Sequence, residues 1–282
     1  MAVIVQFPGS SLSPPPREVT DDKTDLLSTI ISWNIRGLGT FIRDEGIEAI
    51  LSSYPNVSVL CFQEILMQKA DRIQQLIAPY KEAGFHIVLN PSANQRYKSG
   101  TMVMTRETPL STSTSFPGDT LSDEGRVITV ELCDSYIINV YAPASSSRDR
   151  LKTKAEWWTR LCQYLNNLQK KKQIIVCGDL NAVSTKQDIG AILPHSPGCY
   201  TEERQMIRDM ISQLQLVDAY RYMNPDSISF SWVRNHDFPH VGLRIDYCLV
   251  PQHCKSQIQQ CIIDDRLFMS DHYPILLELL RT

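Results

Sequence analysis

The strongest constraint on the fold is a series of short apolar runs, rich in β-branched residues, that alternate with helical stretches. The runs occupy residues 29–33, 57–62, 85–89, 101–105, 127–132, 136–141, 174–178, 245–250 and 274–280. Their lengths, and the Gly, Asn and Ser residues that bound them, are typical of β-strands. Apolar residues recur at three- and four-residue steps in 147–170 and 201–214, which predicts helices, and 42–53 and 66–80 are shorter helix candidates. This mixture, with no internal repeat, predicts one α/β domain over residues 28–282.

Composition narrows the class of protein. The chain has 282 residues, 43% of them apolar and 21% charged, which is ordinary for a globular protein. A net charge of −3 argues against a strongly cationic nucleic-acid binder, although a locally basic groove is compatible with it. The eight cysteines include no CxxC pair, and several lie within apolar runs, which indicates reduced, intracellular thiols.

The first 27 residues differ from the rest of the chain. A short apolar start without a preceding basic region leads into a Pro/Ser-rich and then acidic stretch, which fits neither a signal peptide nor a transit peptide. We expect residues 1–27 to form a disordered tail. No apolar run approaches the about 20 residues of a membrane span. We therefore expect a protein of the nucleus or cytoplasm, neither secreted nor membrane-bound. We also expect it to be a monomer.

Polar side chains stand at the ends of the predicted strands. They are Asn34, Glu64, Tyr141, Asp179, Asn181, Asp246, Asp271 and His272. Ligand sites of α/β sheets often gather at strand ends, because the loops converge there on a rigid support. Taken singly, each residue has an ordinary structural explanation, such as a turn at GDLN, a lysine partner for Glu64 or a buried core position for His272. Their joint occurrence favours a functional site.

The residue types suggest one chemistry. Carboxylate and amide oxygens bind hard cations such as Mg²⁺, which fits Glu64, Asp271 and Asn34. A histidine next to a carboxylate, as His272 with Asp246, can be held protonated toward a phosphoryl oxygen. An Asp beside an Asn, as in GDLN, can position and deprotonate water. Together these groups predict metal-assisted phosphodiester hydrolysis.

The chain resembles the endonuclease/exonuclease/phosphatase superfamily, and within it the exonuclease III-like abasic-site (AP) endonucleases. The resemblance runs from about residue 29 to the C-terminus, through ISWNIRGL, CFQE, DEGRVITVE, INVYAP, IVCGDLN, TEERQM, LVDAYR, FSWVRN, GLRIDYCLV and SDHYPILLEL. It implies a four-layer α/β sandwich, in which two packed mixed β-sheets are flanked by helices.

The resemblance also implies a role for each site residue. Glu64 resembles the main metal ligand, with Asn34 and Asp271 beside it. Asp179 is similar to the residue that activates water or assists the leaving oxygen, oriented by Asn181. Tyr141 and His272 resemble the phosphate-contacting tyrosine and histidine, with Asp246 paired to His272.

FSWVRN and GLRIDY favour the abasic-site branch of the superfamily. There Trp232 and Leu243 would wall a small apolar pocket that accepts a sugar without its base; the alternative for Trp232 is an ordinary core position. Two positions depart from the pattern: Arg36 stands where AP endonucleases usually carry Asp or Asn near the metal, and Ala144 replaces an amide residue. ISWNIRGLG is reminiscent of retrotransposon endonucleases.

Several basic residues could follow a DNA backbone, although most Lys and Arg are simply solvated. They are Arg96, Lys98, Arg126, Arg148, Lys152, Lys186, Arg234 and Arg244. The sequence thus predicts a Mg²⁺-dependent hydrolase (Mn²⁺ being the other candidate ion) that acts in base excision repair. It would cut duplex DNA on the 5′ side of abasic sites, accompanied by 3′-exonuclease or 3′-phosphodiesterase activity. The alternatives are a retrotransposon-type nicking endonuclease and a catalytically silent DNA-binding relative.

Overall fold

The computed structural model of the chain describes residues 27–67, 69–93, 99–191 and 196–281. Residues 1–26, most of the predicted tail, lie outside these ranges, as do Arg96 and Lys98. The division into tail and domain therefore stays a prediction.

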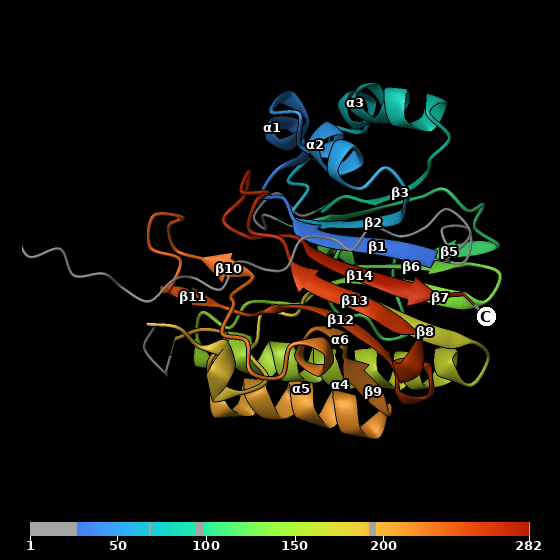
Figure 1. Cartoon of the computed structure of the whole chain (residues 1–282). Helices are drawn as coiled ribbons and strands as arrows, with labels where there is room; N and C mark the ends of the chain where they lie inside the picture. Colours follow the sequence, from blue (N-terminus) through green and yellow to red (C-terminus); the bar gives the residue numbers. More distant parts are fainter. Residues whose placement is uncertain (1–26, 68, 94–98, 192–195, 282) are drawn as a thin grey trace, which may run out of the picture.

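Two six-stranded mixed sheets form the centre of the molecule (Figure 1). The first sheet has the order β13-β14-β1-β2-β4-β3 and comprises β1 (Leu27–Asn34), β2 (Val57–Gln63), β3 (His86–Asn90), β4 (Thr101–Thr105), β13 (Ile258–Ile263) and β14 (Ile275–Leu280). The second has the order β5-β6-β7-β8-β12-β9 and comprises β5 (Ser111–Ser113), β6 (Val127–Glu131), β7 (Ser135–Tyr141), β8 (Gln173–Asp179), β9 (Leu216–Asp218) and β12 (Asp246–Pro251). A separate two-stranded ribbon joins β10 (Trp232–Val233) to β11 (Gly242–Leu243).

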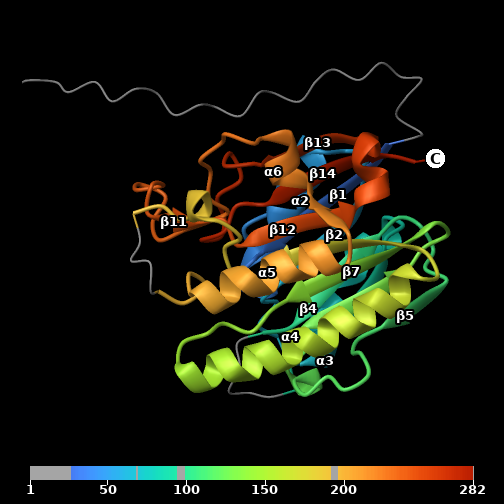
Figure 2. The same cartoon turned by 90° about the horizontal axis from the view of Figure 1, so that it is seen from below.

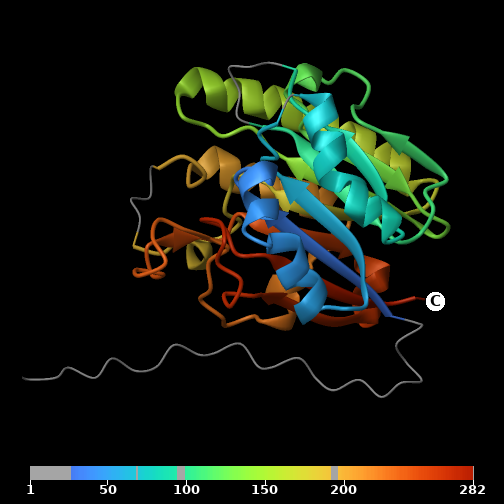
Figure 3. The same ribbon diagram turned by 90° about the horizontal axis from the view of Figure 1, so that it is seen from above.

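Helices cover the outer face of each sheet. Figure 3 shows α1 (Leu38–Arg43), α2 (Gly46–Ser53) and α3 (Ala70–Glu82) over the first sheet. Figure 2 shows α4 (Arg148–Gln169) and α5 (Thr201–Gln213) over the second. The short helix α6 (Ala219–Met223) packs against β12 and β13. The order helix, sheet, sheet, helix confirms the predicted four-layer α/β sandwich.

The central strands are apolar at consecutive positions because both of their faces are buried. In β1, Ile30 packs between the two sheets, whereas its neighbour Ile31 packs toward α1, α2 and α3. In β8, Ile175 faces the other sheet, whereas Ile174 and Val176 pack against α4 and α5. Because successive side chains of a strand point to opposite faces, these strands contribute to three apolar layers. One layer lies between the sheets, and the other two lie between each sheet and its helices.

Several short elements were not predicted, namely β5, β9, β10, β11 and α6, and two further differences have an identifiable cause. The helix predicted over residues 42–53 is two helices, α1 and α2, because Glu45 between them adopts a left-handed backbone with φ 59°. Strand β13 was not predicted, because its sequence IQQCII is interrupted by Gln259 and Gln260. It lies at the edge of the first sheet, where a polar side chain can remain in solvent.

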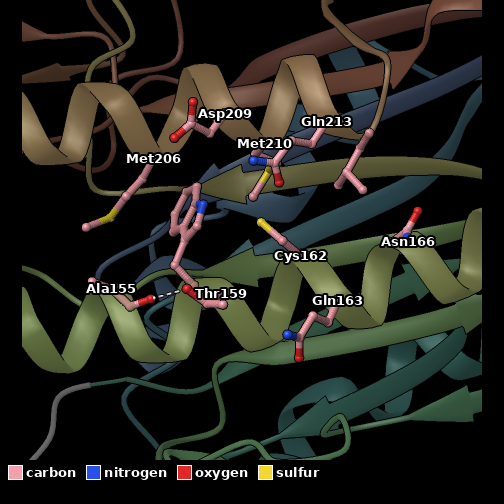
Figure 4. Close-up of a pocket in the computed structure, with 11 residues that line it drawn as sticks. Ala155, Thr159, Cys162, Gln163, Asn166, Met206, Asp209, Met210 and Gln213 are labelled. Atoms are coloured by element: carbon pink, nitrogen blue, oxygen red, sulfur yellow. Dashed lines mark hydrogen bonds between the residues drawn. The ribbon is translucent and has the colours of Figure 1, made fainter.

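A groove between α4 and α5 is lined by Trp158, Met206 and Met210, together with polar residues (Figure 4). The groove lies on the outer side of the second sheet, and none of the predicted site residues lines it. Of the helices in the described ranges, none has the length and apolar character that a membrane crossing requires.

Candidate active site

Asn34, the last residue of β1, joins the two sheets at the edge where the predicted site residues gather. Its Nδ2 donates one hydrogen bond to Glu64 Oε1 over 3.1 Å and another to Asp179 Oδ2 over 3.0 Å. The parallel pairs β1–β2 and β7–β8 place Asn34 beside Gln63 and Tyr141 beside Asp179. Strand ends from both sheets therefore meet at one amide.

Glu64 follows β2 in a left-handed backbone conformation, with φ 54°. Such a backbone is strained for a residue with a Cβ and is often found at functional sites. The Tyr141 hydroxyl donates to Glu64 Oε1 over 2.7 Å. Burial, followed by the charges of Glu64 and Asp179, raises the pKa of Tyr141 well above its usual value, so the phenol remains a donor.

Asp179 lies at the end of β8, directly after a glycine that the local geometry requires. Gly178 has φ 140°, and a Cβ on it would lie 1.9 Å from the Val140 main-chain oxygen. Asn181 follows with φ 50°, and its main-chain N–H donates to Asp179 Oδ1 over 2.8 Å. The Asn181 side chain is fixed in turn by donating to the Ala142 oxygen over 2.9 Å.

Asp179 and Asp246 lie directly opposite each other in the antiparallel pair of β8 and β12. His272 Nδ1 lies 2.8 Å from Asp246 Oδ2, and its Nε2 lies 3.9 Å from Asp179 Oδ2. Burial, followed by the charge of Asp246, raises the pKa of Asp179 to about 7. Burial acts to lower the pKa of His272, but the charge and hydrogen bond of Asp246 outweigh it, and the pKa rises to about 10. Near neutral pH the site therefore holds a protonated histidine beside a carboxyl group that can accept a proton.

Two groups of residues could hold a metal ion. The ligand atoms of Asp179, Asp246 and His272 lie within 4.8 Å of one another. In the first group, however, His272 Nδ1 already lies 2.8 Å from Asp246 Oδ2, as its hydrogen-bond partner. Glu64, Asn34 and Asp271 instead offer the oxygen atoms that hard divalent cations prefer.

Asp271 lies beside the end of β1, because the neighbouring Ser270 hydroxyl donates to the Asn34 main-chain oxygen over 2.7 Å. Asp271 Oδ2 lies 3.5 Å from Nη1 of Arg36, whose side chain is 65% exposed. Arg36, which departs from the AP endonuclease pattern, thus contacts Asp271, one of the predicted metal ligands. Ala144, the other departure, is exposed.

Trp232 and Leu243 are direct partners in the β10–β11 ribbon. They belong to a small apolar cluster with Val183, Cys199 and Ile245. Trp232 Nε1 donates to Asp271 Oδ2 over 3.3 Å. The predicted pocket wall is therefore contiguous with the carboxylates.

Two of the arginines that were predicted to follow a DNA backbone are buried. Arg126 donates to Glu124 Oε2 over 2.6 Å and to the Tyr141 main-chain oxygen over 3.0 Å, with its guanidinium 4.9 Å from the Tyr141 ring centroid. Arg244 is wholly buried between Asp188 and Asp218, at 2.7 Å from each. The other described basic residues of the set are exposed, namely Arg148, Lys152, Lys186 and Arg234.

Lys154 and Glu203 were not among the predicted site residues. These two side chains form a fully buried ion pair of 2.8 Å, and Lys154 Nζ also donates to the Asn181 main-chain oxygen over 2.8 Å. The signal was present in the sequence, since Lys154 lies between Leu151 and Trp158 at helical spacing on the buried face of α4.

Comparison with known proteins agrees with this geometry. The Endonuclease/Exonuclease/phosphatase family matches residues 31–272. The exodeoxyribonuclease of Bacillus subtilis is 28% identical over 256 residues, which cover 87% of this chain and 97% of the relative. The DNA-(apurinic or apyrimidinic site) endonuclease of Dictyostelium discoideum is 31% identical over 257 residues, which cover 87% of this chain and 69% of the relative.

The same fold occurs in the crystal structure of an AP endonuclease from Leishmania major. The two structures align with a TM-score of 0.81 at 22% identity, over 96% of this chain and 93% of that one. The predictions of the superfamily and of a nuclease enzyme are confirmed. This chain belongs to the Endonuclease/Exonuclease/phosphatase family, and its relatives include an exodeoxyribonuclease and an AP endonuclease.

Proposed function

We propose that this nuclease is a Mg²⁺-dependent phosphodiesterase that incises duplex DNA on the 5′ side of abasic sites and acts in base excision repair. The carrying observation is the bridge from Glu64 through Asn34 to Asp179, with His272 3.9 Å from Asp179. These contacts support a site in which a metal-binding oxygen set, a proton acceptor and a cation act together. We place the enzyme inside the cell and expect it to act as a monomer.

Glu64, Asn34 and Asp271 would hold the Mg²⁺ ion. The hydrogen bonds of Asn34 and Tyr141 to Glu64 Oε1 orient the carboxylate before any ion binds. When bound, a divalent ion offsets the charge that develops on a phosphoryl oxygen. Arg36 must move away from Asp271 as the ion binds, which its 65% exposed side chain allows.

Asp179 would accept the proton of the attacking water, because its pKa of about 7 suits a base at neutral pH. Asn181 and Asn34 hold its carboxylate in place. The protonated His272 would donate from Nε2 to a phosphoryl oxygen, since Nδ1 is engaged by Asp246. Tyr141 would contact the phosphate through its hydroxyl.

Specificity for abasic sites would come from Trp232 and Leu243. Their apolar side chains adjoin Asp271, so a sugar next to the scissile phosphate would lie against them. An apolar wall at this position would favour a sugar that lacks its base. The naming of the Dictyostelium relative as an abasic-site endonuclease supports this assignment.

A 3′-exonuclease activity at the same site is the second candidate, favoured by the relation to an exodeoxyribonuclease. Both activities cleave a phosphodiester bond and could use the same Glu64, Asp179 and His272.

The test is cleavage of a labelled duplex that carries one tetrahydrofuran abasic analogue, beside the undamaged duplex and one with a recessed 3′ end. We expect incision at the lesion with Mg²⁺ and none with EDTA. Asp179→Asn should lower the rate by roughly 10²–10⁴-fold, the usual contribution of a general base.

Trp232→Ala should reduce the preference for the lesion, whereas Ile228→Ala, which truncates a side chain that is 72% exposed, should not. Nicking of both duplexes would instead support a retrotransposon-type endonuclease. No cleavage of any substrate would support a silent DNA-binding relative.

A further inference from the structure

Four buried cysteines form a row between the two sheets. Cys177 on β8 and Cys248 on β12 belong to the second sheet, whereas Cys61 on β2 and Cys261 on β13 belong to the first. All four side chains belong to the same buried apolar cluster between the sheets. All four are at most 1% exposed, and none takes part in the proposed reaction.

The central pair of this row lies behind the carboxylates of the active site. Cys177 and Cys248 are directly opposite each other in the antiparallel pair of β8 and β12, two residues from the opposed Asp179 and Asp246. Side chains two residues apart in a strand point to the same face. The thiol pair and the carboxylate pair are therefore neighbours on the inner face of the second sheet.

The two central sulfurs lie 3.7 Å apart, in hydrogen-bond contact. Disulfides span Cα separations of about 4.4–6.8 Å, and directly opposed residues of antiparallel strands are separated by about 4.5 or 5.5 Å. A disulfide between Cys177 and Cys248 therefore needs side-chain rotation that brings the sulfurs to about 2.05 Å, and no separation of the strands.

We propose that Cys177 and Cys248 are a redox site, which a peroxide oxidises to a cross-strand disulfide, and that this oxidation lowers the nuclease activity. In the first step the Cys177 sulfur attacks one peroxide oxygen. An S–O bond forms, the O–O bond breaks, and the products are a sulfenic acid and water. In the second step the Cys248 thiol displaces the sulfenic hydroxyl, which leaves as water. Overall two thiols lose two electrons and two protons, and hydrogen peroxide is reduced to two waters.

A peroxide reaches this pair by local opening of the sheet. Next to β12 lies β9, which has three residues and forms this edge of the second sheet in the described part of the chain. Short edge strands open at lower free energy than the central strands of a sheet. Oxidation is therefore expected to be slower than that of an exposed thiol such as Cys133.

Loss of activity follows from the position of the pair. Drawing the sulfurs together rearranges side chains next to Asp179, whose hydrogen bonds come from Asn34 and from the strained Asn181. Displacements of a fraction of an ångström at a reacting group reduce the rate substantially. We expect at least a fivefold loss, restored by a dithiol reductant.

The test treats the full chain with hydrogen peroxide under native conditions, then denatures it and alkylates the remaining thiols. Tryptic digestion without reduction should yield a linked pair of peptides, 173–186 with 245–255, and fragmentation should assign the bond to Cys248 rather than Cys254. The nuclease activity of the same sample should fall and recover with dithiothreitol.

Cys248→Ala and Cys248→Ser should form no such link and should keep their activity under peroxide, while Cys133→Ser should behave as the unmodified protein. Circular dichroism checks that each variant is folded.

Absence of the linked peptides in the unmodified protein, after Cys133 has been fully oxidised, would overturn the proposal and needs no variant. A complete disulfide with unchanged activity would overturn its regulatory part. Because the linked peptides are detected without any substrate, this result is independent of the proposed DNA specificity.

Discussion

Lys154 donates a hydrogen bond from Nζ to the main-chain oxygen of Asn181 over 2.8 Å, and its side chain is wholly buried. Asn181 has a left-handed backbone, with φ 50°, and this hydrogen bond fixes its main chain. Glu203 balances the charge of Lys154 and also accepts a hydrogen bond from Ser145 over 2.6 Å. Helices α4 and α5 are thus connected to the residue that positions Asp179.

Lys154→Met should destabilise the fold by about 3–5 kcal/mol, the usual result of leaving a buried partner charge unpaired. The double variant Lys154→Met with Glu203→Leu should recover most of this loss, because neither charge of this ion pair is left unpaired. Its kcat should nevertheless stay about tenfold low, since Asn181 has lost its donor. Urea unfolding and kcat measure the two effects, and Arg281→Met, which breaks a surface ion pair with Glu107, is the control. A double variant with full kcat would show that Lys154 acts on stability alone.

The rate should depend on pH as a bell-shaped curve. Asp179 must lose its proton to act as a base, so kcat/KM rises as the pH passes about 7, the pKa of this group. His272 must keep its proton, so kcat/KM falls as the pH passes about 10. Asp246→Asn removes the charge that raises both pKa values and should move both limbs to lower pH. A curve whose limbs do not move in this variant would contradict the assignment of Asp179 and His272.

Asp179 should reduce stability at neutral pH. Its folded-state pKa of about 7 lies above the ordinary 3.8, so the folded protein holds this proton more tightly than the unfolded chain. The resulting penalty grows from about pH 4 to pH 7 and is then constant. Asp179→Asn should therefore raise the melting temperature at pH 8 in EDTA, with a smaller gain at pH 5. An equal gain at both pH values would assign the effect to packing.

Arg36 should weaken the binding of the metal ion, because its Nη1 lies 3.5 Å from Asp271 Oδ2. Exposed ion pairs contribute about 0.2–1 kcal/mol, so Arg36→Ala should lower the Mg²⁺ concentration at half-maximal rate by roughly up to fivefold. A Mg²⁺ titration of the cleavage rate measures this change, and Arg43→Ala, at a more distant exposed pair, is the control. An unchanged or higher Mg²⁺ requirement would show that Arg36 acts on the phosphate instead.

Much of the fold was predictable because, in most segments, the pattern of apolar residues and the residue types favoured the same secondary structure. The runs that became β1 and β8 contain consecutive apolar residues, Ile30 and Ile31 in β1 and 174–177 in β8, as expected for strands covered on both faces. Helices α4 and α5 carry clear helical stripes. The edge strand β13 and the break at Glu45 were not predictable, since both depend on neighbours distant in the sequence or on one strained residue.

The sequence by itself determined which chemical groups are available: carboxylates, amides, a tyrosine and a histidine at strand ends, in motifs that indicate the family. Only the tertiary structure decided which of them touch. The register of β8 against β12 places Asp179 opposite Asp246 and Cys177 opposite Cys248. The hydrogen bond from Lys154 to Asn181 forms only because α4 packs on β8. Register and packing depend on contacts between residues far apart in the chain, which no local pattern encodes. The pKa values of Asp179 and His272 follow from those contacts, because burial and neighbouring charge exist only once the two sheets have packed.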